Sequence, residues 1–192
     1  IIKSAYSTNI KERRDNTTAI MDPDGNVVVQ VESSIPVLLA ALLYGARNVV
    51  AKYKEHPEDI RPGDMFIVND PYKGGGNHLP DISVICPVFA GKKLIGWVAN
   101  TAHHSDIGGK VPGSTSGDAD TLFQEGIRIP IVKICCEGKI NEDVFELLLG
   151  NTRTPDERRG DFTAQISANL IGAEKLLSAY AKYGDTLLDC MA

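Results

Sequence analysis

Two β-rich segments joined by a short turn constrain the fold of this chain more than any other feature. Residues 82–89 and 94–101 are largely β-branched or aromatic, and Gly91 and Lys92 lie between them. Such a pattern is typical of two antiparallel strands joined by a tight turn. The sequence therefore predicts a β-hairpin across residues 82–101.

Counting outward from this turn indicates which residues meet at the open end of the hairpin. Asp81 falls opposite Ala102 and beside His103, and His78 falls near Ser105. Residues far apart in the chain are thereby brought together by strand pairing alone. The candidate site residues gathered there are His78, Asp81, His103, His104 and Asp106.

Two imidazoles and a carboxylate form a ligand set that suits divalent manganese, iron or zinc and leaves positions open for water or substrate. There is a plainer alternative, because a histidine in a surface loop often makes only hydrogen bonds and a single His-x-x-Asp pair occurs by chance. The hairpin predicts convergence independently of residue type, which strengthens the metal interpretation, and both interpretations stay open at this point.

The loop before this hairpin, NDPYKGGGNHLPD at residues 69–81, carries three consecutive glycines. Gly74, Gly75 and Gly76 permit either a sharp turn or a close approach of backbone amides to an anion. No lysine and serine or threonine follow them, so the loop is not a phosphate-binding P-loop. Asp70 is interpreted as a cap of the turn, and the charged run at 11–15 as a solvated face.

The remaining patterns predict an α+β fold, with β-hairpins and a mixed sheet packed against long helices and a helical C-terminal part. A first hairpin is expected around the turn at 22–25, a buried helix at 35–54, a buried strand at 64–70 and further strand at 123–140. Asn141 is expected to cap a helix that ends at Gly150.

A second C-terminal helix is predicted from Thr154 onward, with a capping box and proline at its first position. Its core-facing residues are expected to be Ile166, Leu170, Leu177 and Tyr180.

Composition excludes several classes of protein. The chain has 192 residues, 43% of them hydrophobic and 23% charged, which is enough for one globular domain. The net charge of −5 and the scattered basic residues predict no nucleic-acid partner and no membrane partner. Four cysteines without CxxC spacing indicate a reduced, cytoplasmic protein.

Motifs along nearly the whole chain resemble the amino-terminal part of the hydantoinase B and 5-oxoprolinase family, which includes the large subunits of acetone and acetophenone carboxylases. The motifs are NIKERRD, PGDMFIVNDPY, GGGNHLPDI, ANTAHHSDIGG, PGST, QEGIRIPIVKI, LLLGNTRTPDERRGD and AQISANLIGAEKLL. Members of that family are much longer, so residues 1–192 are expected to be one hydantoinase B-like domain, the N-terminal fragment of a longer subunit.

The resemblance implies a partner of the hydantoinase A type, which binds ATP and phosphorylates the substrate, and hence a hetero-oligomer. It also implies a manganese ion on His78, Asp81 and His103, with zinc or iron as alternatives. His104 or Asp106 is then the expected proton-transfer or supporting group.

The hypothesis is a metal-dependent subunit of an ATP-dependent hydrolase that opens a small cyclic amide. Two rivals remain open at this point. One is carboxylation of a ketone with the same metal, and the other is a scaffold for the ATP-binding partner without turnover of its own.

Overall fold

Seven strands form a single sheet within the residues that the computed structural model describes, which are 1–32, 35–74 and 76–192. Their order across the sheet is β2-β1-β5-β4-β3-β6-β7, and each of these pairs is antiparallel. The strands are β1 (Asn16–Met21), β2 (Val27–Gln30), β3 (Met65–Val68), β4 (Asp81–Ala90), β5 (Lys93–His103), β6 (Val132–Cys136) and β7 (Lys139–Ile140). The predicted α+β class is confirmed, with an antiparallel sheet where a mixed one was expected.

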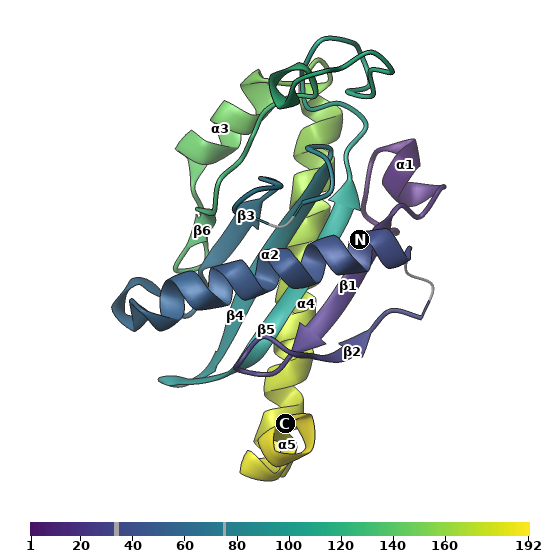
Figure 1. Ribbon diagram of the computed structural model, residues 1–192. Helices are drawn as coiled ribbons and strands as arrows, with labels where there is room; N and C mark the ends of the chain where they lie inside the picture. Colours follow the sequence, from purple (N-terminus) through teal and green to yellow (C-terminus); the bar gives the residue numbers. More distant parts are fainter. Residues whose placement is uncertain (33–34, 75) are drawn as a thin grey trace.

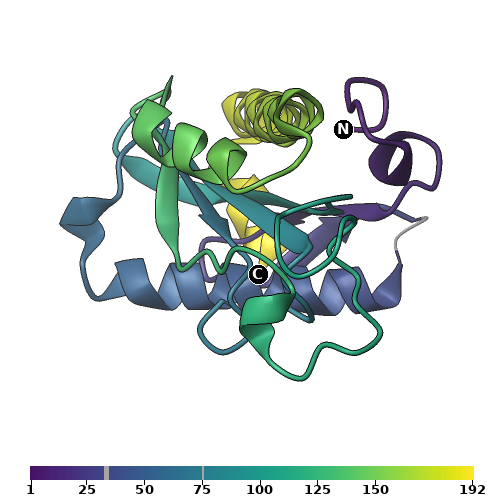
Figure 2. The ribbon, with the colours of Figure 1, turned by 90° about the horizontal axis from the view of Figure 1, so that it is seen from above.

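Helices cover both faces of this sheet and make a three-layer arrangement. Figure 2 shows α2 on one side of the sheet and α3 and α4 on the other. The α-helices are α1 (Thr8–Lys11), α2 (Pro36–Lys54), α3 (Glu142–Gly150), α4 (Pro155–Tyr183) and α5 (Asp185–Met191), and the short 3-10 helices are η1 (Pro57–Asp59) and η2 (Leu122–Gln124). In the described part of the chain no helix is long and apolar enough to span a bilayer.

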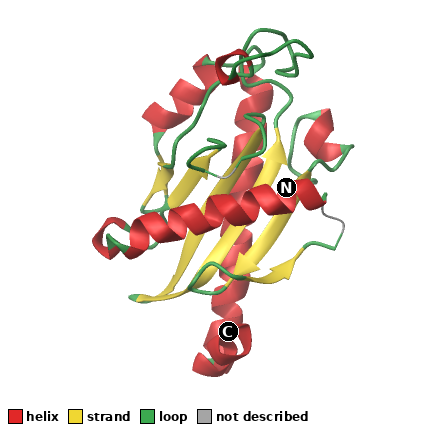
Figure 3. Ribbon diagram, in the orientation of Figure 1, coloured by secondary structure: helices red, strands yellow, loops and turns green. Residues whose placement is uncertain are grey.

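Two hydrophobic cores lie on opposite faces of the central strands. Ile82 and Val84 of β4 pack with residues of α3 and α4, whereas Ile85 packs with residues of α2. This division follows from the pleat, because successive side chains of a strand point to opposite faces. Figures 1 and 3 show that long loops gather at the end of the sheet away from the turn at 90–93, where β4 begins and β5 ends.

The predicted hairpin is confirmed, but its register differs by one residue from the count made from the turn. Asp81 pairs with His103, where it was expected opposite Ala102. The register shifts between Val88 and Phe89, which pair with Gly96 and Leu94. Ile95 is therefore an extra residue, a β-bulge that no count from the turn alone could include.

The buried side of α4 combines a polar stripe with apolar residues, and the predicted core residues of this helix are partly wrong. Ile166 is buried, but Leu170 and Leu177 are 51% and 37% exposed. The side chains that face the sheet and are fully or almost fully buried include Arg158, Asp161, Gln165 and Asn169. They have the expected helical spacing but not the expected hydrophobicity, so a search for apolar periodicity missed them.

The helix starts are partly as predicted. Asn141 caps α3, because its side chain accepts a hydrogen bond from the backbone N–H of Val144. Pro155 lies at the start of α4, but the side chain of Thr154 makes no capping bond and the carboxylate of Glu157 pairs with Arg158. The proposed capping box is therefore wrong, although the position of the helix start is right.

Candidate metal centre

Three of the five candidate residues meet at the open end of the β4–β5 hairpin. Asp81 is the first residue of β4, His103 is the last residue of β5, and His78 lies in the loop that enters β4. Asp81 Oδ1 lies 2.9 Å from His103 Nδ1 and 2.9 Å from His78 Nε2. One ligand atom from each residue falls within 4.8 Å of the others, so this triad can hold a metal ion.

The electrostatics of the triad keep its carboxylate ionised. Burial raises the pKa of Asp81, but the hydrogen bonds from His103 and His78 outweigh it, and the pKa lies below its usual range. The hydrogen bond to Asp81 raises the pKa of His78. The Asp81 and His103 side chains are 4% and 15% exposed while His78 is 40% exposed, so the triad is open to solvent on the side of His78.

The loop that carries His78 is anchored at its base by Asn69. The Asn69 side chain donates to the carbonyls of Leu79 and Ile127 at 2.7 and 2.9 Å and accepts from the backbone N–H of Ile129 at 2.6 Å. Sequence reasoning missed this residue. The available signal was a polar amide directly after a buried strand.

Asp70 caps the turn, as predicted. Its Oδ1 accepts from the backbone N–H groups of Tyr72 and Lys73, and its Oδ2 lies 3.1 Å from Arg128 Nε. The carboxylate is completely buried, so these partners fix the direction in which the loop leaves β3.

The described glycines of this loop permit close backbone packing. A Cβ on Gly74 would lie 2.1 Å from a methyl group of Val68, and a Cβ on Gly76 would lie 2.4 Å from the carbonyl oxygen of Asn69. Gly75 lies outside the described residues. The need for a tight turn therefore explains Gly74 and Gly76, and binding of an anion is not required to explain them.

Helix α2 contacts the same loop through a glycine of its own. A Cβ on Gly45 would lie 2.8 Å from the carbonyl oxygen of Gly74. We expect Gly45→Ala to destabilise the protein by about 1–3 kcal/mol, because the added methyl group pushes the loop away from the helix. Reduced metal retention should accompany this loss.

Gly150→Ala is the matched control, because Gly150 is also helical and a Cβ there meets nothing within 4 Å. Urea unfolding and metal content would be measured on both variants. Equal stability of the two would show that α2 does not constrain the loop.

His104 is not part of the triad, because its side chain points to the α4 face of the sheet. Its Nε2 donates to Gln165 Oε1 at 2.9 Å, and its ring stacks on Phe162 with centroids 4.5 Å apart. Complete burial, with a contribution from the nearby Arg158 guanidinium, lowers the pKa of His104 to about 4. The ring is therefore neutral at pH 7 and joins the polar stripe of α4.

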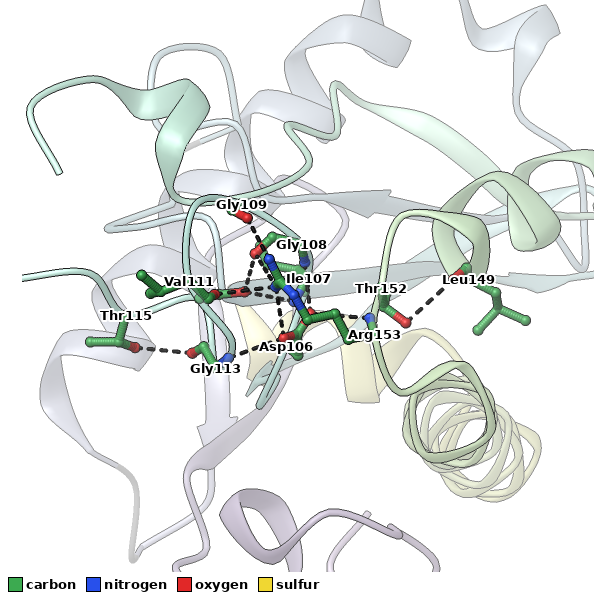
Figure 4. A network of polar contacts seen from close by, with 11 residues as sticks. Asp106, Ile107, Gly108, Gly109, Val111, Gly113, Thr115, Leu149, Thr152 and Arg153 are labelled. Atoms are coloured by element: carbon green, nitrogen blue, oxygen red, sulfur yellow. Dashed lines mark hydrogen bonds and ion pairs between the residues drawn. The ribbon is translucent and has the colours of Figure 1, made fainter.

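Asp106 lies in a separate network that closes the loop after β5 (Figure 4). Its carboxylate accepts from the backbone N–H groups of Gly108 and Gly113 at 2.9 and 3.0 Å and pairs with Arg153 at 3.0 Å. The Arg153 guanidinium also donates to the carbonyls of Gly108, Gly109 and Val111. Sequence reasoning did not single out Arg153, which ties this loop to the segment between α3 and α4.

Comparison with known proteins assigns the chain to a family. The family model described as hydantoinase B/oxoprolinase matches residues 1–192. An uncharacterized protein of Methanocaldococcus jannaschii is 42% identical over 182 residues, which are 95% of this chain and 32% of that protein. The chain therefore spans about a third of the length of this relative.

Two solved structures share the fold. The crystal structure of ATP-dependent caprolactamase from Pseudomonas jessenii matches with a TM-score of 0.84 and 33% identity, over 92% of this chain and 30% of that chain. An acetone carboxylase structure matches with a TM-score of 0.90 over 98% of this chain and 25% of that chain, and its 20% identity shows likeness of fold alone. The family-model match covers the whole sequence, and the chain belongs to the hydantoinase B/oxoprolinase family.

Proposed function

We propose that this chain is the metal-binding part of an ATP-dependent hydrolase that opens a small cyclic amide. The observation that carries the proposal is the triad of His78, Asp81 and His103, whose ligand atoms already converge within 4.8 Å. The family includes oxoprolinases and hydantoinases by its description, and a structure of 33% identity is that of an ATP-dependent caprolactamase. Both point to amide hydrolysis.

The triad fits a divalent cation, with manganese as the expected ion and zinc or iron as alternatives. Asp81 supplies an anionic oxygen and the histidines supply imidazole nitrogens, a combination that suits these metals. When bound there, such a cation would polarise a carbonyl oxygen or lower the pKa of a water molecule. The protein's own contribution is to hold the three side chains in place through the β4–β5 pairing and the Asn69 anchor.

A role in proton transfer for His104 or Asp106 stays a prediction. Within the described residues, the hydrogen bonds of the His104 side chain go to Gln165 and those of the Asp106 carboxylate go to Gly108, Gly113 and Arg153. These contacts favour a supporting role, in which the two side chains fix the backbone that follows His103.

Metal analysis of the purified chain tests the proposal. We expect about one manganese, zinc or iron ion per chain, and ATP-dependent hydrolysis of a lactam once a hydantoinase A-type partner is added. Carboxylation of a ketone by the same mixture would instead support the carboxylase alternative. A chain that holds no metal under metal-replete conditions would favour the scaffold.

The isolated chain is expected to show neither ATP hydrolysis nor lactam opening. Its sequence contains no P-loop and no kinase-type glycine loop, so the nucleotide must be bound by another polypeptide or domain. Phosphate release and lactam consumption would be measured with and without the partner. Robust ATP-dependent turnover by this chain alone would rule out a separate ATP-binding component.

A further inference from the structure

A cavity of about 300 Å³ borders the loop at residues 69–80, which carries His78 and is called the metal loop below. One wall comes from that loop and includes Tyr72 and Asn77, and the other comes from residues 119–125 and includes Asp120, Thr121 and Glu125. The volume is at the small end of the range for small-molecule sites, which suits a single ring. A larger apolar hollow of about 480 Å³, lined by Phe89 and Gly91, lies at the turn end of the hairpin, away from the triad.

Two hydrogen bonds of this lining lie next to the triad in the chain. Glu125 Oε2 accepts a hydrogen bond from the backbone N–H of Leu79 at 3.2 Å, one residue after His78. Asn77 precedes His78 in the chain, and its side chain donates to the carbonyl of Val37 in α2 at 2.9 Å. The Glu125–Leu79 contact therefore joins the two walls next to His78, the most exposed member of the triad, and the Asn77–Val37 contact attaches the first wall to α2.

The wall formed by residues 119–125 is stabilised by hydrogen bonds of its own. Gln124 Oε1 accepts from the backbone N–H of Asp120 at 2.9 Å, and the Gln124 carbonyl accepts from the backbone N–H of Lys110 at 2.8 Å. The cavity is thus formed by two anchored segments.

The charge of the side chains that line the cavity bears on which cyclic amides can bind there. Asp120 and Glu125 are the charged residues that line the cavity, and both are acidic. Their oxygens suit a ligand that donates N–H groups, as an unsubstituted lactam or imide ring does. A carboxylate on the same ring would meet two like charges, and such a juxtaposition costs binding free energy.

We propose that this cavity binds the ring of an uncharged cyclic amide beside the metal, with Glu125 accepting the ring N–H, and that it discriminates against cyclic amides bearing a carboxylate. This inference rests on the proposed function, because it assigns the substrate class of the same site. Asn77 and Tyr72 form the wall on the side of the metal loop.

A matched pair of probes tests this selectivity. 2-Pyrrolidinone and 5-oxoproline share one lactam ring and differ by a carboxylate. Each would be titrated into the isotopically labelled chain, with and without zinc, while the backbone amide signals of residues 71–77 and 119–125 are followed. We expect 2-pyrrolidinone to shift both segments and 5-oxoproline to bind at least about tenfold more weakly.

Two variants and one control test whether the acidic side chains of the cavity cause this selectivity. Glu125→Gln and Asp120→Asn should narrow the difference between the two probes, since each removes one negative charge and keeps a hydrogen-bonding oxygen. Asp118→Asn is the control, because Asp118 is exposed, pairs with Lys110 and does not line the cavity. Equal or tighter binding of 5-oxoproline, absence of shifts in both segments, or an equal effect of the control would overturn the proposal. Metal content, measured separately, tests the proposed function, so the two can fail independently.

Discussion

Asp81→Asn and His78→Ala are each expected to lose bound divalent metal while keeping their fold. Asparagine preserves the size of Asp81 and one hydrogen-bonding oxygen, but it lacks the anionic charge that offsets the cation. Removal of a group that only supports a metal ligand typically costs about 10–100-fold in affinity or activity. Loss of a ligand should cost more than this. Metal content and circular dichroism would be measured on each purified variant.

Variants of the two adjacent histidines distinguish a metal ligand from a supporting residue. His103→Ala should empty the site, whereas His104→Ala should keep the metal and lose about 1–3 kcal/mol of stability, because Gln165 Oε1 then loses its buried partner. His56→Ala serves as a further control, since His56 is an exposed residue whose ring contacts Glu58. A filled site in His103→Ala together with an empty one in His104→Ala would show that the ligand assignment is displaced by one residue.

The position of the triad could be predicted because hairpin geometry depends on few variables. Once a turn at Gly91 and Lys92 is assumed, strand pairing brings Asp81 opposite Ala102 and beside His103, within one residue of the observed register. The bulge at Ile95 was not predictable in this way, since an extra residue in one strand leaves no turn signature. Its effect is considerable, because it places Asp81 and His103 directly opposite each other.

The separate role of His104 follows from the same alternation. Neighbouring residues at the end of a strand point to opposite faces, so His103 and His104 cannot both face the metal loop. The contacts of His104 with Gln165 and Phe162 of α4 place it on the other face. The two histidines are neighbours in the sequence and were assigned to one site, but the pleat of the strand directs their side chains to opposite faces of the sheet.

The polar stripe of α4 shows why the C-terminal helix was less predictable. Asn100 on β5 donates to Asn169 Oδ1 at 2.7 Å, and Gln165 Nε2 donates to the carbonyl of Ile82 and to Asn100 Oδ1, both at 2.9 Å. Buried polar side chains are stable only when partners of this kind satisfy them. Those partners come from distant strands, so the helix sequence alone favours apolar positions, two of which, Leu170 and Leu177, are exposed in this structure.

Asp161→Ala is expected to destabilise the protein by about 3–5 kcal/mol, since it removes the buried counter-charge of Arg158 and leaves only the partly exposed Glu157 as its carboxylate partner. Arg158 and Asp161 are both fully buried, and Arg158 Nη2 lies 2.9 Å from Asp161 Oδ2. Asp161 Oδ1 also accepts from the backbone N–H groups of Tyr6 and Ser7 at 2.8 and 3.0 Å, so the N-terminal segment loses its attachment to α4. Urea unfolding followed by circular dichroism would measure the change.

Glu146→Ala is the matched control for this prediction. It deletes the carboxylate of the Arg159–Glu146 pair, whose side chains are 49% and 63% exposed, and exposed pairs contribute at most about 1 kcal/mol. A double variant, Arg158→Met with Asp161→Leu, should recover much of the stability lost in Asp161→Ala, because no charge is then left buried without a partner. If Asp161→Ala were no less stable than Glu146→Ala, the prediction would be contradicted, because the partly exposed Glu157 would then be a sufficient counter-charge for Arg158.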